Sequence, residues 1–298
     1  MTYSIIRHSV AGVLFTGIIL AYACVAIVTL IDFDKLSFVL SSLAVCLLVA
    51  IIFISLVFVL ARKLKRYDII DIAWGPTFII VSVTSYIIAY DNISLSSLCL
   101  LVLGMVFVWG SLLAWHFGKR KIGSKNEDPR YVELRKNWKG REAVNMYFRV
   151  YIVQAILATI ICIPVIHINL FDGSQWTVLA YIGIAVWLSG IICESIADKQ
   201  LKEHLSSQKN RGKIMQSGLW QYSRHPNYFG EIVQWWGIGI IAAGVAPWWV
   251  GLVGPLTITY LILFVSGIPP TEKRFEGRFG WRSYREKTSA LVPWPPKY

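Results

Sequence analysis

Charge is scarce in this sequence of 298 residues, because Asp, Glu, Lys and Arg together make up only 15% of it. An average soluble domain carries roughly 25% charged residues. Apolar residues make up 56% of the chain and its mean hydropathy is +0.57. These values exclude a disordered chain, a collagen-like fibre and an ordinary water-soluble globule. The 13 Trp, 14 Tyr and 14 Phe residues suit the interfacial belts of a membrane protein.

Cysteines are few, and no two of them lie close together in the sequence. Each of the five lies inside an apolar run: Cys24, Cys46, Cys99, Cys162 and Cys193. A disulfide framework or a zinc site needs clustered spacings such as Cys-x-x-Cys. We therefore expect free thiols packed against helices, and no metal site.

Long uncharged runs recur along the chain. A bilayer-spanning helix needs about 20 apolar residues. The runs predict spans near 10–31, 36–61, 72–90, 92–117, 150–171 and 173–193, and 232–271 is long enough for two more, with a break at 244–247. The sequence thus predicts an all-α integral membrane protein, a bundle of seven or eight transmembrane helices. The first run continues directly into another span, which favours an anchor over a removed signal peptide.

Basic residues are nearly absent from every second connection between these spans. Of the 29 Lys and Arg residues, 28 lie in segments 1–9, 62–71, 118–149, 194–231 and 272–298. Basic loops stay cytoplasmic, so eight spans would place both termini in the cytoplasm. We expect these loops to form any pocket for a polar cofactor. The net charge of +12 then describes one membrane face, and no RNA-binding or helix-turn-helix pattern accompanies it, so nucleic-acid binding is not expected.

Residues 218–231 join a charged loop to an apolar run and read GLWQYSRHPNYFGE. Pro226 suits the first turn of a helix, where its missing N–H has no role. Counted at 3.6 residues per turn, Asn227, Glu231 and Gln234 share one face, with Tyr228 beside them. Because Glu and Gln in a membrane helix are unfavourable without partners, this pattern indicates a functional site. A polar cap that holds the loop to the helix start is the alternative.

The segment Ser223–Glu231 resembles the signature of the steroid 5-alpha-reductase-like membrane reductases, in particular their bacterial branch. The resemblance extends over about 65–298 and includes 71–75, 128–135, 198–201, 266–269 and 288–294. It implies a transmembrane catalytic domain at 65–298, preceded by an N-terminal transmembrane hairpin at 1–64, in a bacterial inner membrane. Arg-His-Pro-x-Tyr also occurs in isoprenylcysteine and phospholipid methyltransferases. A methyltransferase that uses S-adenosylmethionine is therefore the alternative.

The resemblance implies a reductase that uses NADPH to reduce a carbon–carbon double bond conjugated to a carbonyl group. Its substrate would be lipid-like, a steroid or another isoprenoid or fatty lipid. Asn227 and Glu231 would face the nicotinamide and its ribose, and Asp198 would hold sugar hydroxyls. The other residues expected at the cofactor are Arg224 and His225 beside the phosphates, Tyr228 packed on the cofactor, and Arg211, Lys213, Arg130, Arg135 and Arg274. The basic residues among them could instead attract anionic lipid headgroups.

Reduction of an enone also requires a group that stabilises negative charge on the carbonyl oxygen. The resemblance implies a protonated carboxylic acid together with a tyrosine hydroxyl. Asp71 is the best counterpart of the acid, because desolvation at the entry of a span would favour its neutral, donating form. With Glu231 it makes the expected catalytic pair.

The tyrosine has no evident counterpart, since its position falls near Trp109. We expect Asp68, Trp74 and Trp109 at the substrate, and Tyr86 or His116 are candidates for the missing hydroxyl's role. A non-catalytic scaffold or lipid-binding protein is the third hypothesis. The expected partners are a hydrophobic substrate and membrane lipids, and the sequence does not indicate an oligomeric state.

Overall fold

The computed structural model describes residues 33–90, 97–122, 126–136, 138, 140–171, 176–245 and 247–297. The predicted span at 10–31 and Cys24 lie outside these residues. Within the described ranges the regular elements are helices, apart from one isolated β-bridge between Ser223 and Ser289. This confirms the predicted all-α class. The chain divides into two compact units, which are described separately.

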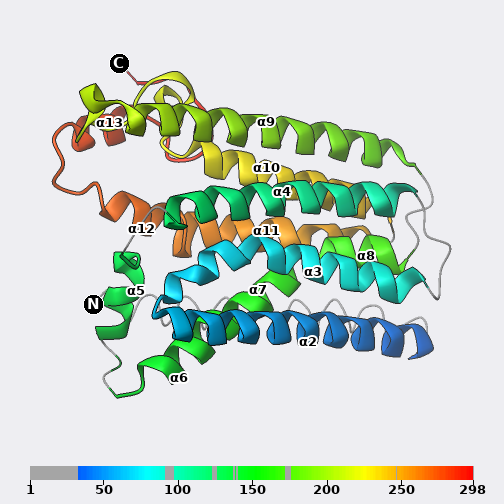
Figure 1. Cartoon of the computed structure of the whole chain (residues 1–298). Coiled ribbons are helices and arrows are strands. Elements are labelled where there is room, and N and C mark those ends of the chain that lie inside the picture. Colours follow the sequence, from blue (N-terminus) through cyan, green and yellow to red (C-terminus); the bar gives the residue numbers. More distant parts are fainter. Residues whose placement is uncertain are drawn as a thin grey trace. The chain divides into compact units, whose positions relative to one another are not determined.

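The N-terminal unit comprises the described residues between 33 and 176 together with those of 245–250. Its elements are α2 (Phe33–Leu64), η1 (Tyr67–Ile69), α3 (Ile70–Tyr90), α4 (Ser97–Ile122), α5 (Pro129–Lys136), α6 (Glu142–Met146), η2 (Tyr147–Tyr151), α7 (Ile152–Ile161) and α8 (Ile163–Leu170). Helix α3 packs against α2, α4, α7 and α8 (Figure 1). It approaches α4 most closely at Gly75, where an added Cβ would overlap the carbonyl of Gly110. Helix α5 lies at the end of this unit where α3 begins and α4 ends.

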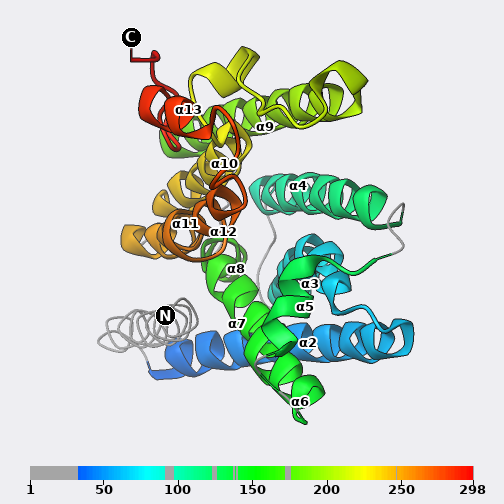
Figure 2. The same cartoon turned by 90° about the vertical axis from the view of Figure 1, so that its left-hand side faces the viewer.

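The C-terminal unit comprises residues 177–244 and those from 251 onward. Its elements are α9 (Val178–Ser206), η3 (Gln208–Asn210), η4 (Gly218–Gln221), α10 (Pro226–Ala243), the end of η5 (Trp248–Leu252), α11 (Val253–Tyr260), η6 (Leu261–Val265), α12 (Ile268–Lys273) and α13 (Trp281–Lys287). Helix α10 begins at Pro226 and ends before the 244–247 break, as the sequence predicts. Figures 1 and 2 both show α9 beside α10 along most of its length.

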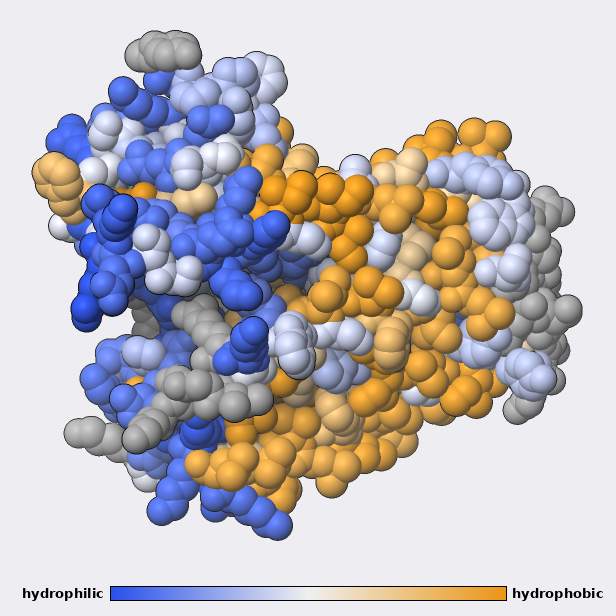
Figure 3. Space-filling model, turned by 45° about the horizontal axis from the view of Figure 1, so that its top comes forward, coloured by the Kyte–Doolittle hydropathy of each residue, from blue (hydrophilic) through white to orange (hydrophobic). Residues whose placement is uncertain are grey.

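Six segments of the described chain are helical, long and apolar enough to cross a membrane: Leu36–Leu64, Tyr67–Tyr90, Ser97–Lys119, Glu142–Ile161, Val178–Ser206 and Trp248–Lys273. Each overlaps a predicted span. Large apolar side chains lie exposed on these helices, for example Leu56 on α2 at 65% exposure. Figure 3 shows a face with wide hydrophobic areas (orange). Lipid would cover such surfaces, so the protein is a multi-pass membrane protein.

The four cysteines within the described residues are free thiols, as predicted. Cys46, Cys99 and Cys162 are buried, and Cys193 is half-buried.

Candidate functional site

The predicted site residues divide between the two units. The C-terminal unit contains Asp198, Arg211, Lys213, Arg224, His225, Asn227, Tyr228, Glu231 and Arg274. The N-terminal unit contains Asp68, Asp71, Trp74, Trp109, Arg130 and Arg135. We describe the two groups in turn.

Glycines bring α9 and α10 into backbone contact. A Cβ added at Gly237 would lie 2.6 Å from the carbonyl oxygen of Gly183, and one added at Gly190 would lie 2.7 Å from that of Gly230. Two glycines spaced seven residues apart on each helix thus form a close-packed seam, the arrangement common between membrane helices. The seam fixes which side chains of the two helices face each other at the end where α10 begins.

Five polar residues meet at that end, and we call them the α9–α10 polar cluster: Glu194, Asp198, Asn227, Glu231 and Gln234. Asn227 Nδ2 donates to Asp198 Oδ1 at 3.2 Å. Gln234 Nε2 donates to Glu194 Oε2 at 2.5 Å and to the carbonyl of Gly230 at 3.3 Å. The structure therefore brings together Asp198, Asn227 and Glu231, which the resemblance placed around one end of the cofactor.

Two amide oxygens in this cluster have no donor. Asn227 Oδ1 and Gln234 Oε1 are both buried, and neither accepts a hydrogen bond from any described residue. Buried polar atoms are rarely left in this state, so each such atom is a candidate contact for a ligand.

Glu194 is a cluster member that the sequence analysis missed. It precedes Asp198 by four residues, so the two side chains share a face of α9. That spacing could have identified Glu194 from the sequence, because two carboxylates one turn apart in an apolar helix are unfavourable and indicate a functional site. Its contact with Gln234 spans 40 residues of sequence and gave no such signal.

Arg224 is fixed at the start of α10 by the C-terminal segment. Its Nε donates to Glu272 Oε1 at 2.7 Å, and its NH1 donates to the carbonyl of Arg285 at 3.0 Å and to that of Thr288. The residue is 9% exposed. Two of its three guanidinium nitrogens are thus used within the protein, and its role beside a phosphate stays a prediction. A buried guanidinium with these partners holds the tail against the motif.

His225 shares the same carboxylate, since its Nε2 lies 3.3 Å from Glu272 Oε1. Its ring stacks on that of Tyr228 at 5.3 Å. The hydroxyl of Tyr228 lies 3.3 Å from Thr271 Oγ1. These contacts order the two residues on one side of the helix start. Their role at a cofactor stays a prediction.

The remaining basic residues of this unit are exposed. Arg211 and Lys213 flank Gly212, whose φ of +80° makes the turn after α9. Arg274 follows directly after α12. All three side chains lie in solvent-accessible positions outside the helical core, where they could meet a phosphate group.

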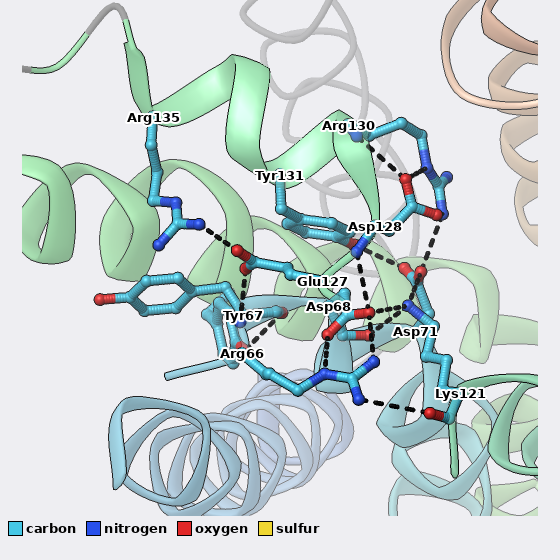
Figure 4. Close-up of polar contacts among 11 residues, drawn as sticks. Arg66, Tyr67, Asp68, Asp71, Lys121, Glu127, Asp128, Arg130, Tyr131 and Arg135 are labelled. Carbon is cyan, nitrogen blue, oxygen red and sulfur yellow. Dashed lines mark hydrogen bonds and ion pairs between the residues drawn. The ribbon is translucent and has the colours of Figure 1, made fainter. Parts of the chain in front are cut away.

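In the N-terminal unit, Asp71 is surrounded by donors (Figure 4). Its Oδ1 accepts from the Tyr131 hydroxyl at 2.5 Å, and its Oδ2 accepts from Lys121 Nζ and Arg130 NH2, both at 2.8 Å. The sequence led us to expect a desolvated carboxyl in its neutral form at this position, and that role of Asp71 stays a prediction. The structure shows three donors around it, one hydroxyl and two cations.

Tyr131 brings a hydroxyl to Asp71 that the sequence did not lead us to expect there. Burial and the adjacent carboxylate of Asp71 raise the pKa of Tyr131 well above its ordinary value, so it remains protonated and donates. Trp109, at the position expected for a tyrosine, is 2% exposed and packs edge-on against Phe78. Trp74 contacts the same phenyl ring from another side. Trp109 is thus buried and Trp74 half-buried beside Phe78, and their role at a substrate stays a prediction.

Asp68 is buried, and its contacts connect different segments of the chain. It forms ion pairs with Lys121 and Arg66, each at 3.1 Å, and accepts from the backbone N–H of Asp128 at 3.2 Å. Lys121 Nζ thus joins Asp68 and Asp71, which lie one turn apart (Figure 4). This network ties α3, α4 and the segment before α5 together.

Arg135 lies at the outer edge of this network. It pairs with Glu127, which also accepts from the backbone N–H of Tyr67 at 2.8 Å. The Arg135 guanidinium lies 5.1 Å from the centre of the Tyr67 ring. Burial raises the pKa of Glu127. Arg135 therefore holds α5 to the start of α3, whereas the resemblance implied a cofactor ligand. His116, a candidate for the missing hydroxyl's role, is exposed, and Tyr86 is half-buried.

Comparisons with known proteins agree with the predicted resemblance. One segment is 32% identical over 66 residues to 3-oxo-5-alpha-steroid 4-dehydrogenase 1 of Bos taurus, covering 22% of this chain and 26% of that protein. Another is 34% identical over 58 residues to the protein of the same name from Mus musculus, covering 20% and 23%. The chain thus aligns with about a quarter of the length of these relatives. No solved structure matches.

A family model described as "protein of unknown function (DUF1295)" matches residues 57–288. The match includes the α9–α10 polar cluster, the Arg224 contacts at the start of α10 and the network around Asp71. Since it covers well over half of the sequence, the chain belongs to the DUF1295 family.

Proposed function

We propose that the protein is an integral-membrane oxidoreductase that uses NADPH to reduce a carbon–carbon double bond conjugated to a carbonyl group. The observation that carries this proposal is the α9–α10 polar cluster, in which carboxylates and unsatisfied amide oxygens gather between apolar helices. Such groups are unfavourable there unless a ligand or a proton compensates. The steroid dehydrogenases that the chain resembles supply the class of reaction.

The residues present fit a dinucleotide. Asn227 Oδ1 and Gln234 Oε1 are acceptors without a donor, and the amide group of a nicotinamide is a donor of matching chemistry. Asp198 suits ribose hydroxyls. Arg211 and Lys213 lie exposed in the same unit, and Arg274 offers a third cation for the pyrophosphate and the 2′-phosphate. Bound NADPH would supply the hydride, while this chain's residues orient the ring and exclude water.

We propose Asp71 and Tyr131 as the carboxyl–hydroxyl pair of the reaction. A carbonyl oxygen that gains negative charge needs donors, and the donors of Tyr131, Lys121 and Arg130 all end on the oxygens of Asp71. To donate its single proton to a substrate oxygen, the Tyr131 hydroxyl would turn away from Asp71. Tyr131 has the hydroxyl that Trp109 lacks. Asp71 would orient that hydroxyl, and the two cations would stabilise the charge. Glu231 keeps the proposed catalytic role at the cofactor, next to Asn227.

The proposed substrate is a steroid or another isoprenoid or fatty lipid, because the surrounding helices are apolar and the relatives are steroid dehydrogenases. The proposed location is a bacterial inner membrane, with both termini in the cytoplasm. Basic residues then face the compartment that holds NADPH and the anionic inner leaflet.

Titration of the detergent-purified protein with NADPH, followed by nucleotide fluorescence, tests the proposal. We expect saturable enhancement. Asn227→Ala should weaken binding about tenfold, because it removes a buried polar contact. Gln208→Ala removes an exposed amide of the same unit and should leave binding unchanged.

Two other outcomes would contradict the proposal. Protection against thermal unfolding by S-adenosylmethionine, without any effect of NADPH, would identify a methyltransferase. Absence of binding of either nucleotide would favour a scaffold or lipid-binding protein.

A further inference from the structure

Two carboxyls of the α9–α10 polar cluster, Glu194 and Glu231, have no basic partner among the described residues. Glu194 lies close enough to Glu231 and Asp198 for their charges to repel one another. Among the residues that the structure describes, no Lys, Arg or His forms an ion pair with Glu194 or Glu231. Carboxylates buried without a cation are strongly unfavourable. Glu194 and Glu231 therefore need either a bound proton or a positively charged ligand.

A second feature points to what completes it. Gln234 is 1% exposed, donates to Glu194 and Gly230, and leaves its Oε1 without a donor. Asn227 likewise directs its Nδ2 to Asp198 and leaves its Oδ1 without one. The open valences of these two amides are thus acceptors. Across the described chain no three His, Cys, Asp or Glu residues are arranged to hold a metal ion. A positively charged organic group with N–H donors has the complementary chemistry.

The nicotinamide of NADP⁺ is such a group, and this step rests on the function proposed above. The ring of NADPH is neutral. When the hydride departs with two electrons, the ring keeps one positive charge. Its amide group donates hydrogen bonds in both redox states. Fixed carboxylates in a dry site stabilise a charge that develops beside them, because they need no reorganisation.

We infer that Glu194 is a specificity-determining residue that, with Glu231, makes this site bind NADP⁺ more tightly than NADPH. The carboxylates discriminate only through the charge of the ring, since the phosphates and sugars of the two nucleotides are the same. A lower energy of the oxidised form also favours hydride donation, so the preference serves the forward reaction.

Calorimetric titration of the full-length protein in detergent with NADP⁺ and, separately, with NADPH measures this preference. We expect the wild type to bind NADP⁺ more tightly. Glu194→Gln keeps the shape and the contact with Gln234 but removes the charge. It should lower the preference for NADP⁺ on the order of tenfold, the low end for close charge pairs. Glu194→Asp retains the charge and should keep the preference.

Glu203→Gln is the matched control, because it removes one carboxylate from an exposed position of the same helix. It should leave both affinities unchanged. If Glu194→Gln does not fold, Glu231→Gln removes the neighbouring charge and must lower the preference in the same way.

The outcomes separate the two proposals. Failure of the wild type to bind either nucleotide overturns the proposed function, and this inference with it. Binding of both nucleotides with a preference that neither Glu194→Gln nor Glu231→Gln changes overturns the inference alone. If Glu203→Gln lost the preference for NADP⁺ to the same extent, the inference would also be overturned. The preference would then depend on the net charge of the protein and not on Glu194.

Discussion

Asp71 shows how a single carboxylate can organise a set of donors. Its two oxygens accept from Tyr131, Lys121 and Arg130, which come from two different elements of the chain. Its side chain is 12% exposed, whereas that of Arg130 is 41% exposed, so the bond from Arg130 is the one most accessible to water. Charge-assisted bonds of this kind are about twice as strong as neutral ones.

Tyr131→Phe tests this arrangement at the residue scale. The variant removes one hydrogen bond to a charged group, and we expect the free energy of unfolding to fall by about 2 kcal/mol. If Tyr131 is the donor of the reaction, kcat should also fall at least about 100-fold. Thermal unfolding in detergent and steady-state reduction of an enone lipid measure the two effects.

Tyr90→Phe is the control for that prediction, because Tyr90 is 69% exposed at the end of α3. It should change neither quantity. A Tyr131→Phe enzyme with normal kcat and lowered stability would leave Tyr131 a purely structural residue.

At the scale of elements, the glycine seam determines the pairing of α9 with α10. An added methyl group at Gly190 would lie 2.7 Å from both the N–H nitrogen of Gln234 and the carbonyl of Gly230. Neither atom belongs to a flexible side chain, so a helix must move. The same movement would displace Gln234 and Glu194, which are part of the polar cluster.

Gly190→Ala should therefore lower the free energy of unfolding by about 2 kcal/mol, as for other overpacked sites. Gly104→Ala is the matched control, since Gly104 also lies within a helix but has no neighbouring atom within 4 Å of an added Cβ. It should be neutral or stabilising by up to about 1 kcal/mol. Equal Tm values for the two variants in the same detergent would contradict the close seam.

Local sequence patterns predicted much of the fold. Apolar run lengths predicted the spans within the described residues, and Pro226 marked the start of α10. Helical spacing placed Asn227, Glu231 and Gln234 on one face. Asp71 and Tyr131 are 60 residues apart in sequence, so local sequence patterns could not predict their hydrogen bond. The same holds for Arg224, whose partners Glu272 and Thr288 follow 48 and 64 residues later.

At the scale of the whole molecule, net charge and topology are linked. The chain carries +12, and nearly all of its Lys and Arg lie in alternate connections. A fluorescent protein fused after residue 298 should fold and fluoresce in a bacterial host, because a cytoplasmic terminus is proposed. An alkaline phosphatase fused at the same place should be inactive. The reverse result would contradict the proposed orientation and the cytoplasmic entry of the cofactor.

The Arg224 contacts also constrain the order of biosynthesis. The guanidinium bonds to carbonyls of residues 285 and 288, and the adjacent Ser223 hydroxyl donates to the carbonyl of Leu291 at 2.6 Å. These partners leave the ribosome 61 to 68 residues after the motif itself. A nascent chain can insert α10 into the bilayer, but the start of that helix acquires its native contacts only once residue 291 has been translated. The native geometry of this helix start thus requires a chain translated through residue 291.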